Sequence, residues 1–551
     1  MKKQEKLCYG ASFKMDYSDE AIKKEETKVL LWDLCNKSTL EHISGNTIDE
    51  FFKFLKDNKK SATIFFHKFS DYIDTVLTYM EENDYKHTTL ALTNVRYYKT
   101  LINGSNVCYG ISFKIAKNAI ITINDSKHKI NSELVDIDKD FKLNVMKKYK
   151  LEDDKDYHKY YSEIIATSMD KMYENGMTGL TGGSDSLNSY KKSLNGEFEK
   201  IFTPLEKEID DFIRKSYSGG SVYLNPSYQG KLNEDEKINV FDINSSYPGV
   251  MCESLLPYGR PEKFKGKYKK DDSYPLYIVK VKVELDLKEN HLPTLMKKQN
   301  GFNEDGKVEY ITSTEDAPIE LHLNNVDLEL MYIHYNIHNI TFLGGYKFHG
   351  STTLFKDYIM KIYEQKLLSV GAKKQLYKIL LNALYGKFGK KTEDSDRIPY
   401  IEDGVIKYKK GEVKITKSVY TAMSSFISSY GRAKLYDAIH KNIKYFVYCD
   451  TDSIHLTTDS PIGIEINNTK LGAWKLEKVY TKSKYLGQKI YMGECEDGKL
   501  DIKVAGCQKG VKKYITFENF EYGNSYPGHI LTKVVKGGKI KIPAYYTLLG
   551  R

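Results

Sequence analysis

The first 170 residues or so alternate between short apolar runs and stretches with helical spacing. Residues 28–33 (KVLLWD) and 62–67 (ATIFFH) have the length and content of strands, and residues 48–56 between them have the spacing of an amphipathic helix. Strand, helix and strand in succession predict an α/β domain. The near-identical heptapeptides 8–14 (CYGASFK) and 108–114 (CYGISFK) are either two strands of one sheet or a coincidence.

Farther along, the pattern predicts a domain boundary and a pair of helices. The small-residue segments 181–186 (TGGSDS) and 218–221 (SGGS) are typical of joints between domains. In residues 351–388 apolar residues recur at helical spacing, with an interruption near 369–371, which predicts two helices joined by a turn. About the last 70 residues are Lys-rich and strand-like.

Length and composition indicate an ordinary folded protein. A chain of 551 residues suggests about three or four domains. Its 40% hydrophobic and 29% charged residues exclude a disordered or collagen-like chain. No stretch approaches the ~18 consecutive apolar residues of a membrane span, no signal peptide is recognisable, and seven cysteines without a CxxC pair do not indicate a disulfide framework. We expect a soluble intracellular monomer without a membrane partner.

The charge balance is compatible with a polyanionic partner. The chain has 84 Lys and Arg against 74 Asp and Glu, a net charge of +10, which a generically basic protein would also show. Most of the cations are Lys, which suits non-specific phosphate contacts. The 45 tyrosines supply rings for stacking as well as for cores.

The segment VFDINSSYP, residues 240–248, places Asp242 at the end of an apolar strand expected at 238–241. That strand would fix the carboxylate at a sheet edge, and the small-residue turn after it would leave room for a phosphate. Asp242 is therefore a candidate metal ligand. The alternative is a helix N-cap, a position that Asp also favours.

The segment YCDTDSIH, residues 448–455, follows a second apolar strand expected at 443–449. Asp450 and Asp452 are two residues apart, so they point to the same side of a strand or hairpin. Two like charges held a few Å apart repel unless a cation lies between them, and Mg²⁺ takes oxygen ligands and keeps phosphates in its shell. The alternative is an exposed turn, but the apolar runs on both sides favour a hairpin with the site at its tip.

A Lys-bearing helix is expected over residues 373–391. Lys374, Lys378, Asn382 and Tyr385 recur at the spacing of one helical face, which would suit a triphosphate and a base. The alternative is a solvated amphipathic helix. Two carboxylate strands together with such a helix are the equipment of two-metal phosphoryl transfer.

Other candidate sites are weaker. His334 and His338 have the i, i+4 spacing of a helix, but no third metal ligand is evident, which favours a satisfied or solvated pair. No Gly-rich loop leads into a G-K-[ST] sequence, so the chain has no P-loop.

The three acidic and basic segments resemble, in order, the motifs of the family B DNA polymerases. Residues 242–248 (DINSSYP) are similar to motif A (DxxSLYP), residues 378–386 (KILLNALYG) to motif B and residues 448–453 (YCDTDS) to motif C. Motif A departs from the usual pattern at Ser246, where the family usually has Leu.

The intervals between the motifs narrow the resemblance. Asp242 and Asn382 are 140 residues apart, and Asn382 and Asp450 are 68 apart, which leaves room for two insertions, as in the protein-primed polymerases of small phages and linear plasmids. Other segments similar to that subgroup are 217–220 (YSGG), 325–330 (NVDLEL), 354–359 (LFKDYI), 489–491 (KIY) and 516–520 (TFENF).

The resemblance implies an α/β multi-domain fold, a right-hand polymerase of palm, fingers and thumb with an N-terminal ribonuclease H-like domain of the exonuclease type. The implied parts are an exonuclease-like domain at 1–180, the palm at 181–254 and 417–504, insertions of the terminal-protein region at 255–350 and 392–416, the fingers at 351–391 and the thumb at 505–551.

The resemblance also implies residue roles. The catalytic carboxylates would be Asp242, Asp450 and Asp452, and two Mg²⁺ ions, or Mn²⁺, would be held by Asp242, Ile243 and Asp452. The dNTP would contact Tyr247, Lys366, Lys378, Asn382 and Tyr385, with Tyr247 as the steric gate against a ribose 2′-OH. The DNA would contact Tyr217, Gly219, Gly220, Thr421, Arg432, Lys489 and Tyr491.

The N-terminal domain departs from the family at its exonuclease ligands. The four positions at which the family has metal-binding carboxylates align with Ser12, Lys14, Tyr72 and Tyr161. Without those oxygens two Mg²⁺ ions cannot be held, so we predict a domain that keeps its fold without proofreading. A one-residue slip would put Asp71 in register, but three ligands would still be missing.

The implied function is template-directed DNA synthesis on a linear genome in the cytoplasm of a host cell. Initiation would use a terminal protein as primer, and elongation with dNTPs would be processive and strand-displacing, with the two insertions holding the terminal protein and encircling the DNA. One alternative is a polymerase that extends only DNA or RNA primers. Another is a non-catalytic DNA-binding scaffold, against which the intact Asp242, Asp450 and Asp452 argue.

Overall fold

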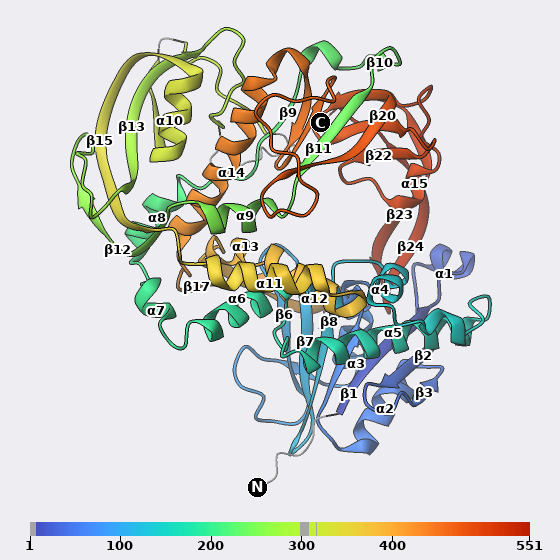
Figure 1. The fold of residues 1–551 in the computed structure, drawn as a ribbon. Helices are drawn as coiled ribbons and strands as arrows, with labels where there is room; N and C mark the ends of the chain where they lie inside the picture. The colour runs from blue at the N-terminus through green and yellow to red at the C-terminus, as the bar shows by residue number, and fades with distance from the viewer. Residues whose placement is uncertain (1–6, 298–307, 316, 551) are drawn as a thin grey trace.

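In the described part of the chain, three β-sheets and two long hairpins are connected by helices (Figure 1). The structure is a computed structural model, and it describes residues 7–297, 308–315 and 317–550. None of its helices is both long and apolar enough to cross a membrane within those ranges.

The N-terminal eight-stranded sheet carries helices on both faces. Its strands follow the order β3-β2-β1-β4-β8-β7-β6-β5, with β1, β4 and β8 parallel. Along β4, Ile64 and Phe66 pack with α2 and α3, whereas Phe65 packs with α5 on the other face, as expected of a strand buried on both sides. The strands are β1 (Leu7–Met15), β2 (Val29–Asn36), β3 (His42–Gly45), β4 (Ala62–Phe66), β5 (Lys86–His87), β6 (Tyr97–Ile102), β7 (Cys108–Ala116) and β8 (Ala119–Asp125). The helices are α1 (Asp19–Lys24), α2 (Ile48–Asn58), α3 (Ile73–Glu82), α4 (Leu134–Phe141) and α5 (Asp154–Glu174).

The local predictions for this region are confirmed, with one exception. Strands 28–33 and 62–67 and the helix between them correspond to β2, β4 and α2, and the two heptapeptides lie on β1 and β7 of the same sheet. The exception is that residues 181–186, for which no helix was expected, begin α6 (Gly182–Ser193), which Thr181 caps through its hydroxyl; the domain boundary near them stays a prediction. Asp185 of that helix forms a buried ion pair with Lys129 at 2.8 Å, which ties the segment to the N-terminal domain.

The central sheet has the strand order β22-β21-β20-β11-β19-β18-β9, and β10 pairs with β20. The helix α14 (Thr421–Lys441) packs beneath it, where Leu435 and Ile439 meet Phe241 and Cys449. The predicted hairpin is confirmed as β18–β19, although β18 starts later than expected because residues 443–445 form a 3₁₀ turn. The strands are β9 (Val222–Leu224), β10 (Leu232–Asn233), β11 (Ile238–Ile243), β18 (Phe446–Asp450), β19 (Ser453–Leu456), β20 (Trp474–Gly487), β21 (Ile490–Cys495) and β22 (Leu500–Val504).

A four-stranded sheet, in the order β12-β15-β13-β14, occupies the first predicted insertion. Its elements are β12 (Leu256–Phe264), β13 (Leu276–Leu287), β14 (Ile319–Asn324), α10 (Asn325–His334) and β15 (Tyr335–Ser351). The expectation that His334 and His338 share a helix is wrong, because His334 ends α10 and His338 lies on β15, where it pairs with Asp286.

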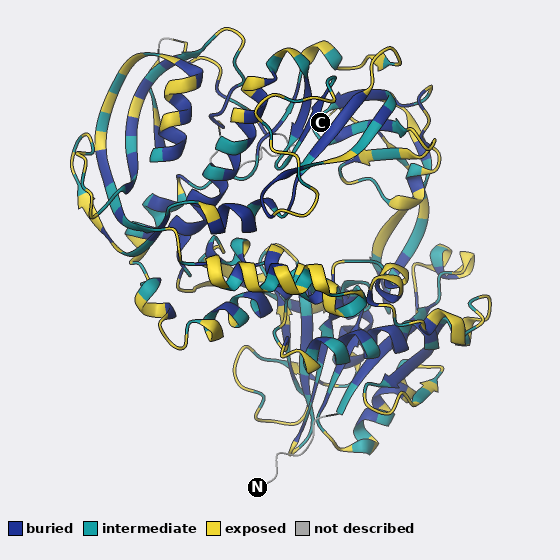
Figure 2. Cartoon of the chain, viewed as in Figure 1, coloured by how far each residue is buried: buried dark blue, intermediate teal, exposed yellow. Residues whose placement is uncertain are grey.

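Three helices follow this sheet, α11 (Lys356–Leu368), α12 (Gly371–Asn382) and α13 (Tyr385–Phe388). The predicted pair with a break near 369–371 is confirmed as α11 and α12, which expose one long face (Figure 2). Tyr385 does not share the face of α12 as predicted, because the helix ends at Asn382 and Tyr385 opens a separate short helix. The remaining helices before the motifs are α7 (Phe198–Ile201), α8 (Lys207–Arg214) and α9 (Ser246–Glu253).

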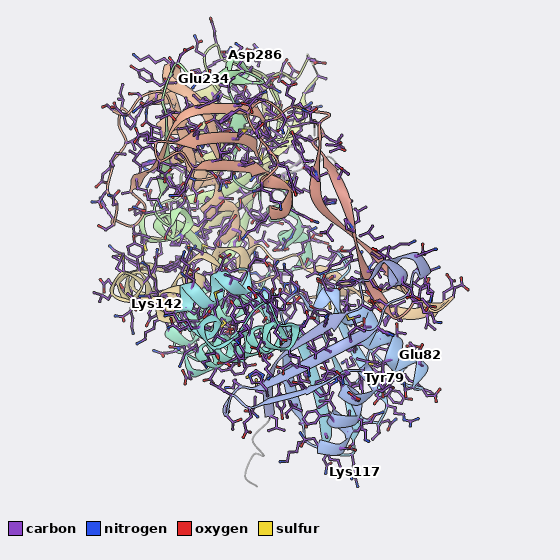
Figure 3. The ribbon with its side chains drawn as sticks, turned by 90° about the vertical axis from the view of Figure 1, so that its right-hand side faces the viewer. Tyr79, Glu82, Lys117, Lys142, Glu234 and Asp286 are labelled. Carbon is purple, nitrogen blue, oxygen red and sulfur yellow. The ribbon has the colours of Figure 1, made fainter. Side chains whose placement is uncertain are left out.

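Two hairpins reach the N-terminal domain, and Figures 1 and 3 show the second of them, β23–β24, descending to it from the upper half of the molecule. The first, β16 (Glu393–Glu402) with β17 (Val405–Ile415), lies against β6 and α3 and buries Ile406 in the N-terminal core. The second, β23 (Ser525–Val535) with β24 (Gly538–Thr547), follows α15 (Lys509–Lys512) and lies against α1 and α3.

Candidate active site

Three carboxylates gather at one edge of the central sheet. Asp242 of β11 lies opposite Ser453 of β19, and Asp450 of β18 lies opposite the same serine. Residues directly opposed on neighbouring strands point to one face, so Asp242 and Asp450 share a face. Asp452 stands in the turn between β18 and β19, and its carbonyl accepts the N–H of Ile243 at 2.9 Å. Two distant segments of sequence are thereby fastened into one site.

The turn that carries Asp452 is tight. Thr451 has a left-handed φ of 60°, and the N–H of Asp452 donates to the carbonyl of Asp450 at 2.7 Å. The N–H of Thr451 donates to Ser221, at 2.7 Å. A Cβ on Gly220 would lie 2.6 Å from Thr451, so glycine is required there for the 218–221 loop to approach the turn.

The electrostatics of the site favour a cation. Burial, followed by the charges of Asp242 and Asp450, raises the pKa of Asp452 to about 7. Burial also raises the pKa of Asp242, an effect that Lys475 opposes from 3.4 Å. Lys489 reaches Asp450 with N···O distances of 3.0 and 3.1 Å. Crowded carboxylate oxygens are the donor set that Mg²⁺ or Mn²⁺ takes.

A cavity of about 540 Å³ opens on these carboxylates. Lys489 and Tyr491, both predicted to contact DNA, line it together with basic residues to which the sequence reading gave no role, namely Lys478, Lys503 and Lys512. A cavity lined by both carboxylates and lysines suits a ligand whose phosphates are bound by metal ions and by cationic side chains.

A second group of cations, Lys366, Lys374, Lys378 and Lys475, lies together near the end of β11. Lys366 lies 3.3 Å from the hydroxyl of Ser245 at the start of α9. Burial lowers the pKa of Lys366, and the neighbouring Lys378, Lys374 and Lys475 lower it further. Four cations in one place would be stabilised by a bound polyanion. Sequence reasoning gave Lys475 no role, because only the pairing of β20 with β11 brings it beside Asp242.

Three tyrosines from separate motifs form the wall beside this group. The ring of Tyr247 stacks on Tyr385 with centroids 4.1 Å apart, and the hydroxyl of Tyr385 is 3.0 Å from that of Tyr217. Burial raises the pKa of Tyr247 to about 12, so the phenol stays neutral. Asn382 is the last residue of α12, shortly before Tyr385 in the sequence, and its side chain is exposed.

Comparison with known proteins decides the family. The model of DNA polymerase type B, organellar and viral, matches residues 155–469. The DNA polymerase of Bacillus phage M2 is 35% identical over 92% of this chain and 93% of its own length, and that of Bacillus phage phi29 is 34% identical over the whole of both chains. The chain belongs to the type B DNA polymerases of organelles and viruses. It is a DNA-directed DNA polymerase.

The fold agrees with this assignment. The phi29 DNA polymerase complexed with primer-template DNA superposes with a TM-score of 0.90 at 32% identity, over 99% of this chain and 100% of the other. The polymerase is therefore a right-hand polymerase with an N-terminal exonuclease domain.

Two residues predicted to contact DNA are placed differently. Thr421 is fully buried, and its hydroxyl donates to Asp210 at 2.7 Å. Arg432 is also buried, pairs with Asp327 at 2.7 Å and donates to the carbonyl of Gly219 at 2.7 Å. Their burial does not support direct DNA contact. Arg432 instead holds the loop that packs on the catalytic turn.

The two β1 residues that the motif alignment places at exonuclease positions each contact a residue of α5. Ser12 Oγ and His158 Nδ1 are 2.6 Å apart, and Lys14 forms an ion pair with Asp154 of α5. Burial, the largest influence, lowers the pKa of His158 to about 4, so its imidazole is neutral near pH 7. By the motif alignment, a hydroxyl and a cation, each with its own partner on α5, stand at the two β1 positions.

The other two aligned residues, Tyr72 and Tyr161, are part of an aromatic cluster. Tyr161 accepts a hydrogen bond from the hydroxyl of Tyr157 at 2.7 Å. The ring of Tyr72 packs 5.8 Å from that of Phe13, and burial raises its pKa, with Tyr161 among the neighbouring groups that raise it further. The four aligned residues therefore gather around β1 and α5.

Proposed function

We propose that this polymerase replicates a linear genome by two-metal nucleotidyl transfer, with protein-primed initiation and processive, strand-displacing elongation. The convergence of Asp242, Asp450 and Asp452 on one face of the palm is the observation that carries the chemistry. Full-length similarity to phage polymerases, together with sheet and hairpin insertions between the motifs, supports the mode of replication. The relatives that cover nearly the whole chain come from phages, so the cytoplasm of the host cell is the proposed place of action.

Each residue of the site has a part in this scheme. Asp242, Asp452 and the backbone carbonyl of Ile243 would hold two Mg²⁺ ions, with Asp450 beside them. The ions supply a Lewis acid for the attacking and leaving oxygens. Lys366 and Lys378 bind the triphosphate.

The tyrosine wall and the DNA-facing residues complete the scheme. Tyr247, braced by Tyr385, blocks a ribose 2′-OH, and Asn382 lies at the nascent base pair. Tyr217 and Gly219 guide the template, and Lys489 and Tyr491 steady the primer terminus.

The N-terminal domain is proposed to lack 3′–5′ proofreading. The four aligned positions supply a hydroxyl, an ammonium and two phenols, and none of these replaces a carboxylate as a Mg²⁺ ligand. Lys14 would repel a cation outright. The domain keeps its fold, with Tyr72 and Tyr161 packed against its two cores.

A labelled primer tests the polymerase site and the loss of proofreading together. A 5′-labelled primer on a longer template is incubated with Mg²⁺, with and without dNTPs. We expect extension with dNTPs and an intact primer without them. Shortening of the primer without dNTPs would contradict the loss of proofreading, and a folded, DNA-bound protein that cannot extend it would contradict the site.

Protein priming requires a separate assay. Purified terminal protein of the same replicon is incubated with the polymerase and labelled dNTPs, without a DNA primer. Transfer of label to the protein is expected, with the phosphodiester formed on a side-chain hydroxyl. If only DNA or RNA primers are extended, the protein-primed mode is abandoned and the alternative polymerase mode replaces it.

A further inference from the structure

The tip of the β23–β24 hairpin is docked on the N-terminal domain. The N–H of Thr27 donates to the carbonyl of Lys536 at 2.9 Å, and Glu26 and Lys536 form a β-bridge. The tip residues Gly537 and Gly538 have φ angles of 79° and 142°, and a Cβ on Gly537 would lie 2.0 Å from the carbonyl oxygen of Thr27. The backbone of the hairpin tip therefore fits closely against residues 26–27 of the N-terminal domain.

A row of ion pairs runs along this contact. Four lysines of the hairpin meet four acidic residues of the N-terminal domain, as Lys533–Glu25 at 2.5 Å, Lys536–Glu26 at 3.3 Å, Lys539–Asp74 at 2.9 Å and Lys541–Asp71 at 3.0 Å. The first two pairs are half exposed, and exposed pairs contribute little. The Lys539–Asp74 pair differs, because the side chains are only 19% and 1% exposed.

Asp74 also holds the other hairpin. Its second carboxylate oxygen accepts a hydrogen bond from the hydroxyl of Tyr408 on β17 at 2.6 Å. Beside Tyr408, Ile406 is buried in the N-terminal core, and Arg397 of β16 donates to the carbonyl of Gly104 at 3.0 Å. One buried carboxylate therefore joins the second insertion and the thumb, and we call Asp74, Tyr408 and Lys539 the clasp.

The clasp completes a circuit of contacts. The chain runs from the fingers into β16–β17 and from the palm into β23–β24, and both hairpins end on α3 of the N-terminal domain (Figures 1 and 3). The labelled Glu82 marks the end of α3 in Figure 3. Asp71 and Asp74 flank Tyr72, so the acidic residues beside this former exonuclease position are committed to the thumb.

We propose that Asp74 is a positioning residue that keeps the polymerase closed around DNA and so sets how many nucleotides are added in each binding event. The inference deepens the proposed function, because it assumes that the two hairpins enclose the primer-template. DNA without a free end can enter only when the clasp opens. The N-terminal domain then provides the surface on which the two hairpins complete the ring.

Asp74→Asn tests the charge without removing the shape. The amide oxygen can still accept from Tyr408, but Lys539 loses its counter-charge. Extension in the presence of an unlabelled DNA trap measures the product length per binding event. We expect that length to fall by about tenfold or more, because removing one partner of a buried pair leaves the other charge uncompensated. The rate of one nucleotide addition by preformed complexes should stay unchanged.

Glu25→Gln is the matched control. It neutralises an acid–lysine pair of the same hairpin, but that pair is exposed, so the product length should stay unchanged at physiological salt. Equal losses in both variants, or no loss with Asp74→Asn, would overturn the proposal. Failure of wild-type protein to extend any primer would instead contradict the proposed function.

A cross-link tests the ring if Asp74→Asn does not fold. Glu26→Cys combined with Lys536→Cys places two thiols at the β-bridge, where a disulfide would lock the hairpin tip. The oxidised variant should extend primers on linear DNA but fail on primed circular DNA, and reduction should restore both. Oxidised wild type controls for the native cysteines. Equal use of circular DNA by locked and reduced enzyme would overturn the proposal.

Discussion

Asp452 is the carboxylate of the site whose pKa burial and its acidic neighbours raise to about 7. It lies in a tight turn against Ile243 and has the charges of Asp242 and Asp450 as neighbours. Asp452→Asn keeps the size of the side chain and removes one anionic ligand. We expect primer extension to fall by about a thousandfold or more, since a metal ion contributes several kcal/mol to such transfers. DNA affinity, measured by gel shift, should be retained; weaker binding with normal turnover of the bound complex would contradict the role.

Tyr247 provides a second residue-scale prediction, on the choice of sugar. Its ring stacks on Tyr385 with centroids 4.1 Å apart, and it lies near the charge of Asp452. Tyr247→Ala should raise the ratio of ribonucleotide to deoxyribonucleotide incorporation by about a hundredfold, the order of selectivity that one hydroxyl allows in a shaped pocket. Single-nucleotide kinetics with dATP and ATP measure it. Tyr247→Phe keeps the ring and should keep the discrimination, and if it does not, the hydroxyl rather than the ring is the gate.

At this scale, the sequence placed the ligands better than their supports. Asp242 and Asp452 could be assigned because apolar strands lead into them, and strand pairing then brings them together. Lys475 and Arg432 could not, since their neighbours come from distant segments. A buried Arg and a DNA-binding Arg are identical in sequence, and only the Asp327 partner distinguishes them.

At the scale of elements, the β16–β17 hairpin can be deleted as a unit, because its two ends lie side by side. The N–H of Thr416 donates to the carbonyl of Thr392 at 2.7 Å, so residues 393–415 can be replaced by a short Gly-Ser turn. We expect single-nucleotide addition to persist and synthesis on long templates to be shortened strongly, because the second insertion no longer closes the circuit. Denaturing gels of trapped reactions measure both. An unchanged product length on long templates would contradict the role assigned to this insertion.

Element prediction succeeded where the periodicity was local. The helices α11 and α12 follow from apolar spacing and the break at Ser369, and β18–β19 follows from its two apolar runs. The helix at 181–186 was not foreseen, since a Thr cap and the buried partner Lys129 turn a Gly-rich segment into a helix. The end of α12 at Asn382 was missed for the same reason, because packing rather than propensity fixes it.

For the whole molecule, stability should depend on pH through a buried cluster of the N-terminal domain. His42 lies between Asp33, at 2.8 Å, and Glu163, at 3.6 Å. Burial alone would lower the pKa of His42, but hydrogen bonds with Asp33, Cys35 and Glu163 outweigh it and raise the pKa to about 11. Burial would raise the pKa of Glu163, but its bonds with His42 and other donors bring it to about 2.

His42 and Glu163 contribute to the free energy of unfolding in different pH ranges. The contribution of His42 is complete below its ordinary pKa of 6.5 and is lost as the pH rises through about 11. That of Glu163 is present above 4.5 and is lost as the pH falls through about 2. Between pH 7 and 10 the wild type should therefore lose up to about 1.4 kcal/mol per pH unit through His42 alone.

His42→Gln should flatten this dependence. The apparent Tm of the variant should be lower than that of wild type near pH 6, and the two values should approach each other as the pH rises toward 10. His338→Gln is the control, because that histidine is exposed and pairs with a single exposed carboxylate. Parallel Tm curves for wild type and His42→Gln across this range would mean that the Asp33–His42–Glu163 cluster does not hold a proton on folding.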